Sequence, residues 1–220
     1  MSAQLQNIVN EFVMMWVLID PVGTVPVFLL ATRGMRPAQQ RQIAIRSTCT
    51  AAAVLLFFAL GGEIFLKALG IPLTSFQIAG GIVLFLFALT MVFGEPITKR
   101  STEEVEEASE ERVRSLAVYP LAIPAIASPG AMLGAVMLTD VEHVSVAHRA
   151  EDIVIILVIV AITLGFMLAA KPVIRVLGDA GINVIGRIMG LILAAVAVDS
   201  VLVAVARFFS IKGVPTGGLL

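Results

Sequence analysis

Charged residues are scarce in this sequence: they make up 14% of its 220 positions, whereas 59% of the positions are hydrophobic. Soluble domains carry roughly 25% charged residues, so this composition, with a mean hydropathy of +1.00, excludes an ordinary soluble fold. Cysteine is nearly lacking too. Cys49 is the single cysteine, which excludes a disulfide within the chain and a zinc or iron–sulfur site built on cysteine. We therefore interpret the chain as an integral membrane protein whose surroundings are a lipid bilayer.

The common motifs of soluble enzymes are lacking as well. The sequence has no Walker loop, no G-x-S-x-G elbow and no H-E-x-x-H pair, so nothing in it indicates catalysis or ATP-driven pumping. His143 and His148 fall in one predicted loop without the spacing of metal ligands. We expect no enzyme activity, no cofactor, no metal site and no nucleic-acid partner. Any transport must run downhill or be coupled to an ion gradient.

Six apolar stretches are long enough to cross a membrane, since about 20 apolar residues, rising about 1.5 Å each, cross roughly 30 Å of hydrocarbon. The polar segment from Met1 to Glu11 lacks the basic region of a signal peptide, so we expect the first span to be retained. The predicted fold is all-α, with spans near Ile8 to Ala31, Ser47 to Leu69, Leu73 to Phe93, Leu116 to Leu138, Ile153 to Ala170 and Ile182 to Ala206.

One hydrophilic segment, residues 95–115, divides the chain into two units of three spans, 1–94 and 116–220. The segment is rich in glutamate, and we interpret it as a solvated loop. Most Lys and Arg residues gather after the first, third and fifth spans. The positive-inside rule then predicts a cytoplasmic acidic loop and two outside termini in the cell (inner or plasma) membrane. Glu63 and Lys67 are spaced for an i, i+4 pair at the outer end of the second span.

The first span is interrupted in its middle by Asp20 to Pro26, Asp-Pro-Val-Gly-Thr-Val-Pro. Proline disfavours helical backbone in the residue before it and lacks a backbone donor, whereas Asp followed by Pro is typical of a helix start. The fourth span repeats the pattern within Ile123 to Ala131, with Ser128 at the cap position and Pro129 in the first turn. Irregular backbone at this depth is tolerated only where protein buries it or where it lines a wet cavity. Both breaks therefore predict half-helices that begin at a site near the midplane.

The two units of the chain align at a shift of about 108 residues. Pro21 then falls on Pro129 and, with one further residue, Gly81 falls on Gly190. Three spans per unit is an odd number, so the two units must have opposite orientations in the membrane. Inverted repeats with broken helices at the midplane are typical of secondary transporters.

Acidic residues inside the spans are candidate functional groups. A carboxylate near the bilayer centre costs several kcal/mol, so we expect Asp20 to face the protein interior with a partner or a proton. Its alternative role is only to cap a half-helix. Asp199, in the sixth span, and its repeat-mate Thr90, in the third, are further candidates for ion coupling, and the alternative for Asp199 is a place near the outer interface.

Other polar and small residues in the spans are interpreted as helix contacts. Gln77, Thr90 and Thr163 are expected to hydrogen-bond across helices. The glycines interpreted as close-packing positions are Gly80, Gly81, Gly186 and Gly190.

Three segments carry a family resemblance: Asp20 to Phe28, Phe76 to Ile82 and Pro120 to Ala131. In combination they resemble the MarC family of bacterial and archaeal membrane proteins, over essentially the whole chain. The resemblance implies a six-span fold and, through a member assigned to transport of small neutral amino acids, a substrate such as glycine or alanine. Many members have Asn where this chain has Thr24, and Gly where it has Ser128.

We therefore expect a secondary transporter of small neutral amino acids, coupled to a gradient of H⁺ or Na⁺. The carboxylate of a zwitterion fits the N–H groups of two half-helix starts, and its ammonium group fits Asp20, Ser128 and exposed carbonyls. The expected substrate-binding residues are Asp20, Pro21, Gly23, Thr24, Ser128, Pro129, Gly130 and Ala131.

Two alternatives use the same features differently. An exporter or channel for other small solutes needs the breaks but, in the case of a channel, no alternating access. An intramembrane enzyme with Asp20 and Asp199 as an aspartyl pair is the least favoured, because a carboxylate dyad works only when the two groups share a proton at close range.

Overall fold

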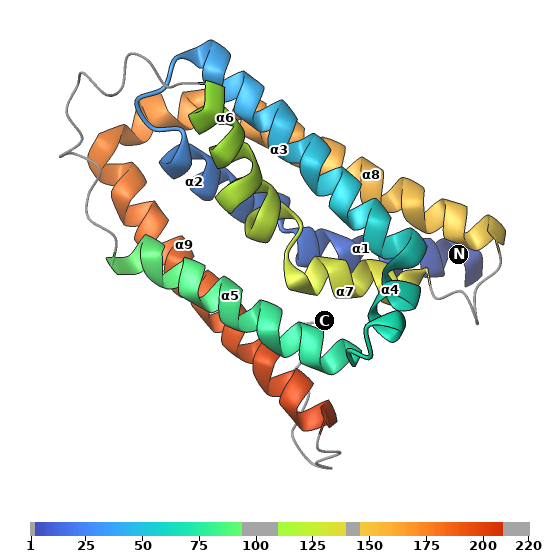
Figure 1. Ribbon diagram of the computed structural model, residues 1–220. Helices are drawn as coiled ribbons and strands as arrows, with labels where there is room; N and C mark the ends of the chain where they lie inside the picture. Colours follow the sequence, from blue (N-terminus) through green and yellow to red (C-terminus); the bar gives the residue numbers. More distant parts are fainter. Residues whose placement is uncertain (1–2, 94–109, 140–145, 209–220) are drawn as a thin grey trace.

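Every regular element of the described chain, which covers residues 3–93, 110–139 and 146–208 in a computed structural model, is a helix (Figure 1). This confirms the predicted all-helical class. The elements are α1 (Ala3–Ile19), α2 (Pro21–Ala31), α3 (Pro37–Phe57), η1 (Phe58–Gly62), α4 (Glu63–Ala68), α5 (Leu73–Phe93), α6 (Glu110–Leu116), η4 (Ala117–Ile126), α7 (Pro129–Leu138), α8 (Val146–Ala169) and α9 (Lys171–Phe208).

The candidate membrane spans of the described chain number five, or six when one bent pair is taken as a span. The bent pair joins Glu110–Ile126 to Pro129–Leu138 at an angle of 59°. A polytopic helical membrane protein with a broken helix in its fourth span is therefore confirmed. The continuous candidate spans are Gln6–Ala31, Pro37–Ala68, Leu73–Phe93, His148–Ala169 and Val184–Phe208.

Apart from α5, the helices that carry the six predicted spans all begin earlier than the apolar runs predict. The second span starts at Pro37, where the backbone N–H of Arg36 donates to Gln39 Oε1 at 3.1 Å and caps the first turn. The fourth starts at Glu110, which lies 3.5 Å from Arg114 across one turn. Hydropathy locates only the part of a helix that lies in hydrocarbon, so it does not detect a polar first turn outside that part. Residues 95–109 of the predicted acidic loop lie outside the described residues.

The helices form two groups, as Figure 1 shows. One contains α1, α2, α3, α8 and the segment α6–η4, and the other is the long pair of α5 and α9, with α7 in contact with both. The core of the first group includes the fully buried Met15, Ile19, Leu55, Leu121 and Ile156. This core joins α1, α3, η4 and α8, and the proline that follows each break, Pro21 or Pro129, is buried in protein.

Helices α5 and α9 pack closely because each contributes a glycine at which the backbone of the other helix approaches. A Cβ atom added at Gly81 would lie 3.2 Å from the carbonyl oxygen of Ala197, and one added at Gly190 would lie 3.0 Å from that of Ala88. Both positions also meet a side-chain atom below 3.0 Å, so the neighbours would have to shift. The predicted close packing at these two glycines is confirmed.

Polar side chains in the spans mostly bond within their own helices. Gln77 Nε2 donates to Ser200 Oγ at 3.2 Å between α5 and α9, as predicted. Thr90 and Thr163 instead donate to carbonyl oxygens of their own helices, at 2.7 Å and 2.9 Å. The expectation of bonds across helices was wrong for these two threonines, because a threonine hydroxyl reaches a carbonyl one turn back without a second helix.

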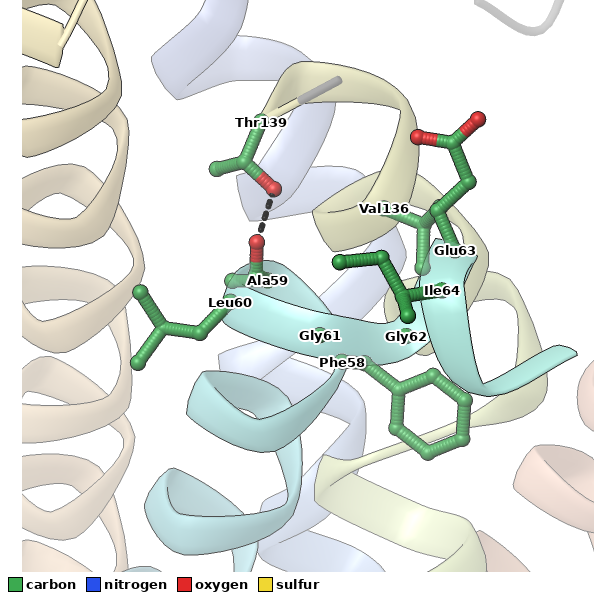
Figure 2. A pocket seen from close by; sticks show the side chains of 9 residues that line it. All are labelled: Phe58, Ala59, Leu60, Gly61, Gly62, Glu63, Ile64, Val136 and Thr139. Carbon is green, nitrogen blue, oxygen red and sulfur yellow. Dashed lines mark hydrogen bonds between the residues drawn. The ribbon is translucent and has the colours of Figure 1, made fainter. Parts of the chain in front are cut away.

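A π-helical turn, η1, interrupts the second span near its end. Such turns alter the regular i to i−4 pattern, and here the carbonyl of Ala59 accepts a hydrogen bond from Thr139, the residue that follows α7, beside a small pocket (Figure 2). The predicted ion pair of the following α4, Lys67 Nζ with Glu63 Oε1, is confirmed at 2.6 Å. The bond at Ala59 ties the end of α7 to the second span.

Candidate functional site

The first half-helix starts at Asp20, between α1 and α2. Its backbone lies in the left-handed region, with φ 47° and ψ 69°. Asp20 Oδ1 accepts from the N–H of Gly23 at 2.8 Å, and its carbonyl accepts from the N–H of Thr24 at 3.0 Å. A Cβ atom at Gly23 would lie 1.9 Å from Oδ2, so glycine is what lets the carboxylate lie over the first turn. The predicted cap is confirmed.

The second half-helix starts at Ser128, between η4 and α7. The backbone of Ser128 is extended, with φ −68° and ψ 156°, and its Oγ accepts from the N–H of Ala131 at 3.0 Å. Its carbonyl accepts from the N–H of Met132 at 2.8 Å. The two starts therefore follow the same rule, in which a side-chain oxygen caps the third residue of a helix that begins with proline.

A hydrogen bond links the two starts. The hydroxyl of Ser128 donates to the carbonyl oxygen of Leu18 at 3.1 Å, and Leu18 lies in the last turn of α1, just before Asp20. A Cβ atom added at Gly134 would lie 2.4 Å from Leu18 Cδ1, so α7 crosses the end of α1 at a glycine. The starts of α2 and α7 consequently lie within about one helical turn, roughly 5 Å along an axis, of a shared contact.

Helix α5 also contacts the start of α7. A Cβ atom added at Gly80 would lie 2.2 Å from Pro129 Cβ and 2.4 Å from its Cγ, so the backbone of α5 touches the first residue of α7. The close packing predicted at Gly80 is thus confirmed. The three segments that carry the family resemblance lie far apart in the sequence, and these contacts bring them to one site.

The two helix starts differ in charge. At α2 the carboxylate of Asp20 occupies the N–H of Gly23, whereas at α7 the neutral hydroxyl of Ser128 occupies the N–H of Ala131. The caps engage neither Val22 nor Gly130, whose N–H groups are the remaining donors of the two first turns. Because helix starts favour negative charge, α7 offers an anion a place, while the Asp20 end favours a cation.

The structure places the predicted substrate-binding residues together and the other coupling candidates elsewhere. Asp199 is exposed on α9, and the described chain shows no hydrogen bond or ion pair from it; Thr90 is exposed on α5 and bonds to its own helix. Among the predicted site residues, Asp20, Ser128 and Gly130 are half-buried, and the buried ones are Pro21, Gly23, Thr24, Pro129 and Ala131.

Sequence reasoning missed how both half-helices end. Thr32 follows α2 and its Oγ1 donates to Phe28 O at 2.7 Å, and Thr139 follows α7 and donates to Ala135 O at 2.7 Å. The available signal was a threonine 11 residues after Pro21 and another 10 residues after Pro129. It also missed the carbonyl of Leu18, which no side-chain pattern reveals.

Comparison with known proteins agrees with this architecture. Residues 5–209 of this chain match the family with the description "MarC family integral membrane protein". A UPF0056 membrane protein of Methanocaldococcus jannaschii is 37% identical to this chain over 90% of the chain and 95% of the relative. YhcE of Escherichia coli, also a UPF0056 membrane protein, is 32% identical over 90% of this chain and 91% of its own length. YvbG of Bacillus subtilis, which has the same description, is 31% identical over 88% of this chain and 92% of its own length. No solved structure matches.

Proposed function

This chain belongs to the MarC family of integral membrane proteins, and we propose that it is a secondary transporter of small neutral amino acids such as glycine and alanine. The observation that carries the proposal is the 3.1 Å hydrogen bond from Ser128 Oγ to Leu18 O, which joins the two half-helix starts. In secondary transporters the substrate lies at such half-helix ends near the midplane.

The chemistry of the two starts suits a zwitterion. In this proposal Asp20 Oδ2 receives the ammonium group, and the first turn of α7, with the N–H of Gly130, receives the carboxylate. Gly23 and Gly130 remove side-chain volume beside both positions. A ligand with a short side chain therefore fits best. The carboxylate of the substrate belongs at α7 alone, because Asp20 already occupies the start of α2.

Two inverted three-helix repeats complete the proposal. The shift that places Gly81 on Gly190 also places Ala88 on Ala197. When each residue is replaced by its repeat-mate, the close approach of Gly81 to Ala197 corresponds to the close approach of Gly190 to Ala88. An exchange of this kind supports a pseudo-two-fold axis between α5 and α9.

The proposed topology follows from the basic residues of the connections. Both termini lie outside, the loop at residues 95–115 is cytoplasmic, and the repeats occupy residues 1–94 and 116–220. In the proposed topology the interruptions of the first and fourth spans, at Asp20 and before Ser128, lie near the midplane.

We assign coupling to H⁺ or Na⁺ to Asp20 rather than to Asp199 or Thr90. Asp20 lies at the junction of the two starts, while Asp199 is exposed on α9. An aspartyl pair needs its carboxyl groups close enough to share a proton, so this placement favours a carrier over an intramembrane enzyme.

Uptake of labelled glycine and alanine into proteoliposomes tests the function. With an inward H⁺ or Na⁺ gradient we expect saturable uptake, and preloaded unlabelled amino acid should accelerate it by counterflow. Protein-free liposomes and reconstituted Asp20→Asn are the controls. Uptake without counterflow would point to a channel, and no uptake by folded protein under any gradient would overturn the amino-acid assignment.

A further inference from the structure

A cluster of ionisable side chains lies away from the half-helix starts, where α1 meets the beginning of α8. Glu11 comes from α1, and His148 and Asp152 come from the first two turns of α8; one ligand atom of each lies within 4.8 Å of the others. Figure 1 shows the beginning of α8 beside the N-terminal end of α1. Glu11 precedes Asp20 by nine residues, about 14 Å along a helix, so the cluster is separate from the proposed substrate site.

Two carboxylates of the cluster have buried oxygens without a hydrogen-bond partner in the described chain. Asp152 is 0% exposed, and neither of its carboxylate oxygens has a hydrogen-bond partner. Glu11 Oε2 is also buried without a partner, and Arg149, on the same turn as His148, has a buried Nε that pairs with neither acid. Burying an unpaired carboxylate costs several kcal/mol, and a second one nearby raises that cost. Buried charges of this kind are stabilised by coordinating a cation.

His148 has the orientation of a metal ligand. Its Nε2 lies 3.0 Å from Glu11 Oε1, and its Nδ1 lies 3.4 Å from Glu151 Oε2. Metal-binding histidines commonly direct one ring nitrogen at the ion while the other donates to a carboxylate that fixes the ring. Glu151, which is half-exposed, holds this second position.

We propose that Glu11, His148 and Asp152 form a binding site for a divalent transition-metal ion of the Zn²⁺ class, with Glu151 orienting the imidazole. Ligand bonds of about 2.0–2.2 Å in a tetrahedral site place ligand atoms roughly 3.4 Å apart, close to the spacing between His148 and Glu11. Three protein ligands leave one position for water.

The donor set selects among ions. One imidazole nitrogen and two carboxylates suit Zn²⁺, whereas Ca²⁺ needs about six to eight oxygen ligands and Mg²⁺ keeps most of its water. The cluster of Glu11, His148 and Asp152 contains no thiolate, which disfavours Cu⁺. With the topology proposed above, the site lies at the outer side of the membrane, so the ion comes from outside the cell.

Titration of purified, tag-free full-length protein in detergent with Zn²⁺, after removal of metal by a chelator, tests the site directly. Calorimetry should show one saturable site per chain in the wild type. His148→Gln and Asp152→Asn should weaken binding by about 100-fold or more, and Glu151→Gln by about 10–100-fold, as for other residues that orient a ligand. Glu110→Gln, an exposed acid paired with Arg114 on α6, is the matched control and should bind as the wild type does.

A second measurement separates metal binding from folding. Zn²⁺ should raise the thermal unfolding midpoint of the wild type and of Glu110→Gln by binding to the folded state, but not that of Asp152→Asn. Without metal, Asp152→Asn should be at least as stable as the wild type, because it removes one of two neighbouring buried carboxylates. Glu11→Gln provides an independent variant should Asp152→Asn fold poorly.

Two outcomes would overturn the proposal. One is the lack of saturable Zn²⁺ binding to folded wild-type protein, which would leave His148 as an ion-pair partner of Glu11 only. The other is binding that survives both Asp152→Asn and Glu11→Gln. Neither outcome depends on transport, so the proposed function stands or falls separately.

Discussion

α2 follows α1 after a single non-helical residue, Asp20, whereas α7 follows a segment in which Tyr119, Ile123 and Ala127 all leave helical geometry. The first junction lies within one continuous candidate span, Gln6–Ala31, while the second bends its span by 59°. Upstream prolines explain the difference. Pro120 and Pro124 precede Ser128, and each removes a backbone donor and disfavours helix in the residue before it, but α1 contains no proline.

The same two starts differ in what they offer a ligand. A charged cap at Asp20 makes the beginning of α2 suitable for a cation, and a neutral cap at Ser128 leaves the positive end of α7 for an anion. One capping rule thus produces two unlike halves of a binding site. The variants below test this contrast, from the largest expected effect to the smallest.

Asp20→Asn should affect transport most. Asparagine caps a helix about as well as aspartate and tolerates left-handed backbone, so the fold should persist while the charge is lost. A hydrogen bond to a charged group contributes about 1.5–3 kcal/mol, which predicts a loss of roughly 10- to 150-fold in kcat/KM for glycine uptake.

The matched control is Asp199→Asn, on the exposed side of α9, which should keep wild-type uptake. Full transport by Asp20→Asn with unchanged pH dependence would remove the charge contrast between the two starts.

Gly80→Ala should separate α5 from the start of α7. The added Cβ atom would meet the ring of Pro129 at 2.2 Å, and overpacking of this kind costs about 1–3 kcal/mol. Gly130→Ala is the comparison, because its Cβ atom would meet Leu18 Cδ2 at an ordinary 3.5 Å. Unfolding by sodium dodecyl sulfate in mixed micelles measures both variants, and equal stabilities would argue against the close contact at Pro129.

Ser128→Ala should lower the free energy of unfolding by about 1–2 kcal/mol. It removes the cap on Ala131 and the bond to Leu18, each contributing about 1 kcal/mol. Ser128→Thr keeps the hydroxyl and should recover most of the loss in the same micelle assay. If alanine and threonine behaved alike, the hydroxyl bridge between the two starts would have no role in stability.

Thr139→Val should cost more than Thr32→Val, although both threonines follow a half-helix. The single O–H of Thr139 is shared between the carbonyl oxygens of Ala59 in η1 and Ala135 in α7 (Figure 2), so it joins two elements, whereas that of Thr32 bonds to Phe28 in its own helix. We expect about 1 kcal/mol for Thr139 and a few tenths for Thr32 from the net value of one hydrogen bond. The difference between the unfolding free energies of Thr139→Val and Thr32→Val is the quantity to measure. A larger loss for Thr32→Val would contradict a stabilising contact between Thr139 and Ala59.

Local patterns in the sequence predicted much of the fold and part of the site. The third span was placed at Leu73 to Phe93, as the structure has it, because an apolar run bounded by proline and glycine defines both ends. The caps at Asp20 and Ser128 were predicted for a similar reason, since capping involves only residues three positions apart. The polar first turns before Ser47 and Leu116 were missed because they lie outside the apolar runs.

Contacts between distant residues were beyond such patterns. Glu11 and His148 belong to different units of the chain, so no spacing indicated that they meet. Thr90 was expected to bond across helices, but its hydroxyl found a carbonyl of its own helix. The exposed position of Asp199 likewise depends on which face of α9 packs against α5.

The sequence by itself determined where the two half-helices begin, where helices are long enough to cross a membrane and where proline interrupts them, because those properties depend on neighbouring residues and on the thickness of hydrocarbon. Tertiary structure decided that the starts of α2 and α7 meet at Leu18, that α5 touches Pro129, and that Glu11, His148 and Asp152 converge. Such meetings depend on how whole helices pack, and close packing is set by the shapes of facing surfaces rather than by any single stretch of chain.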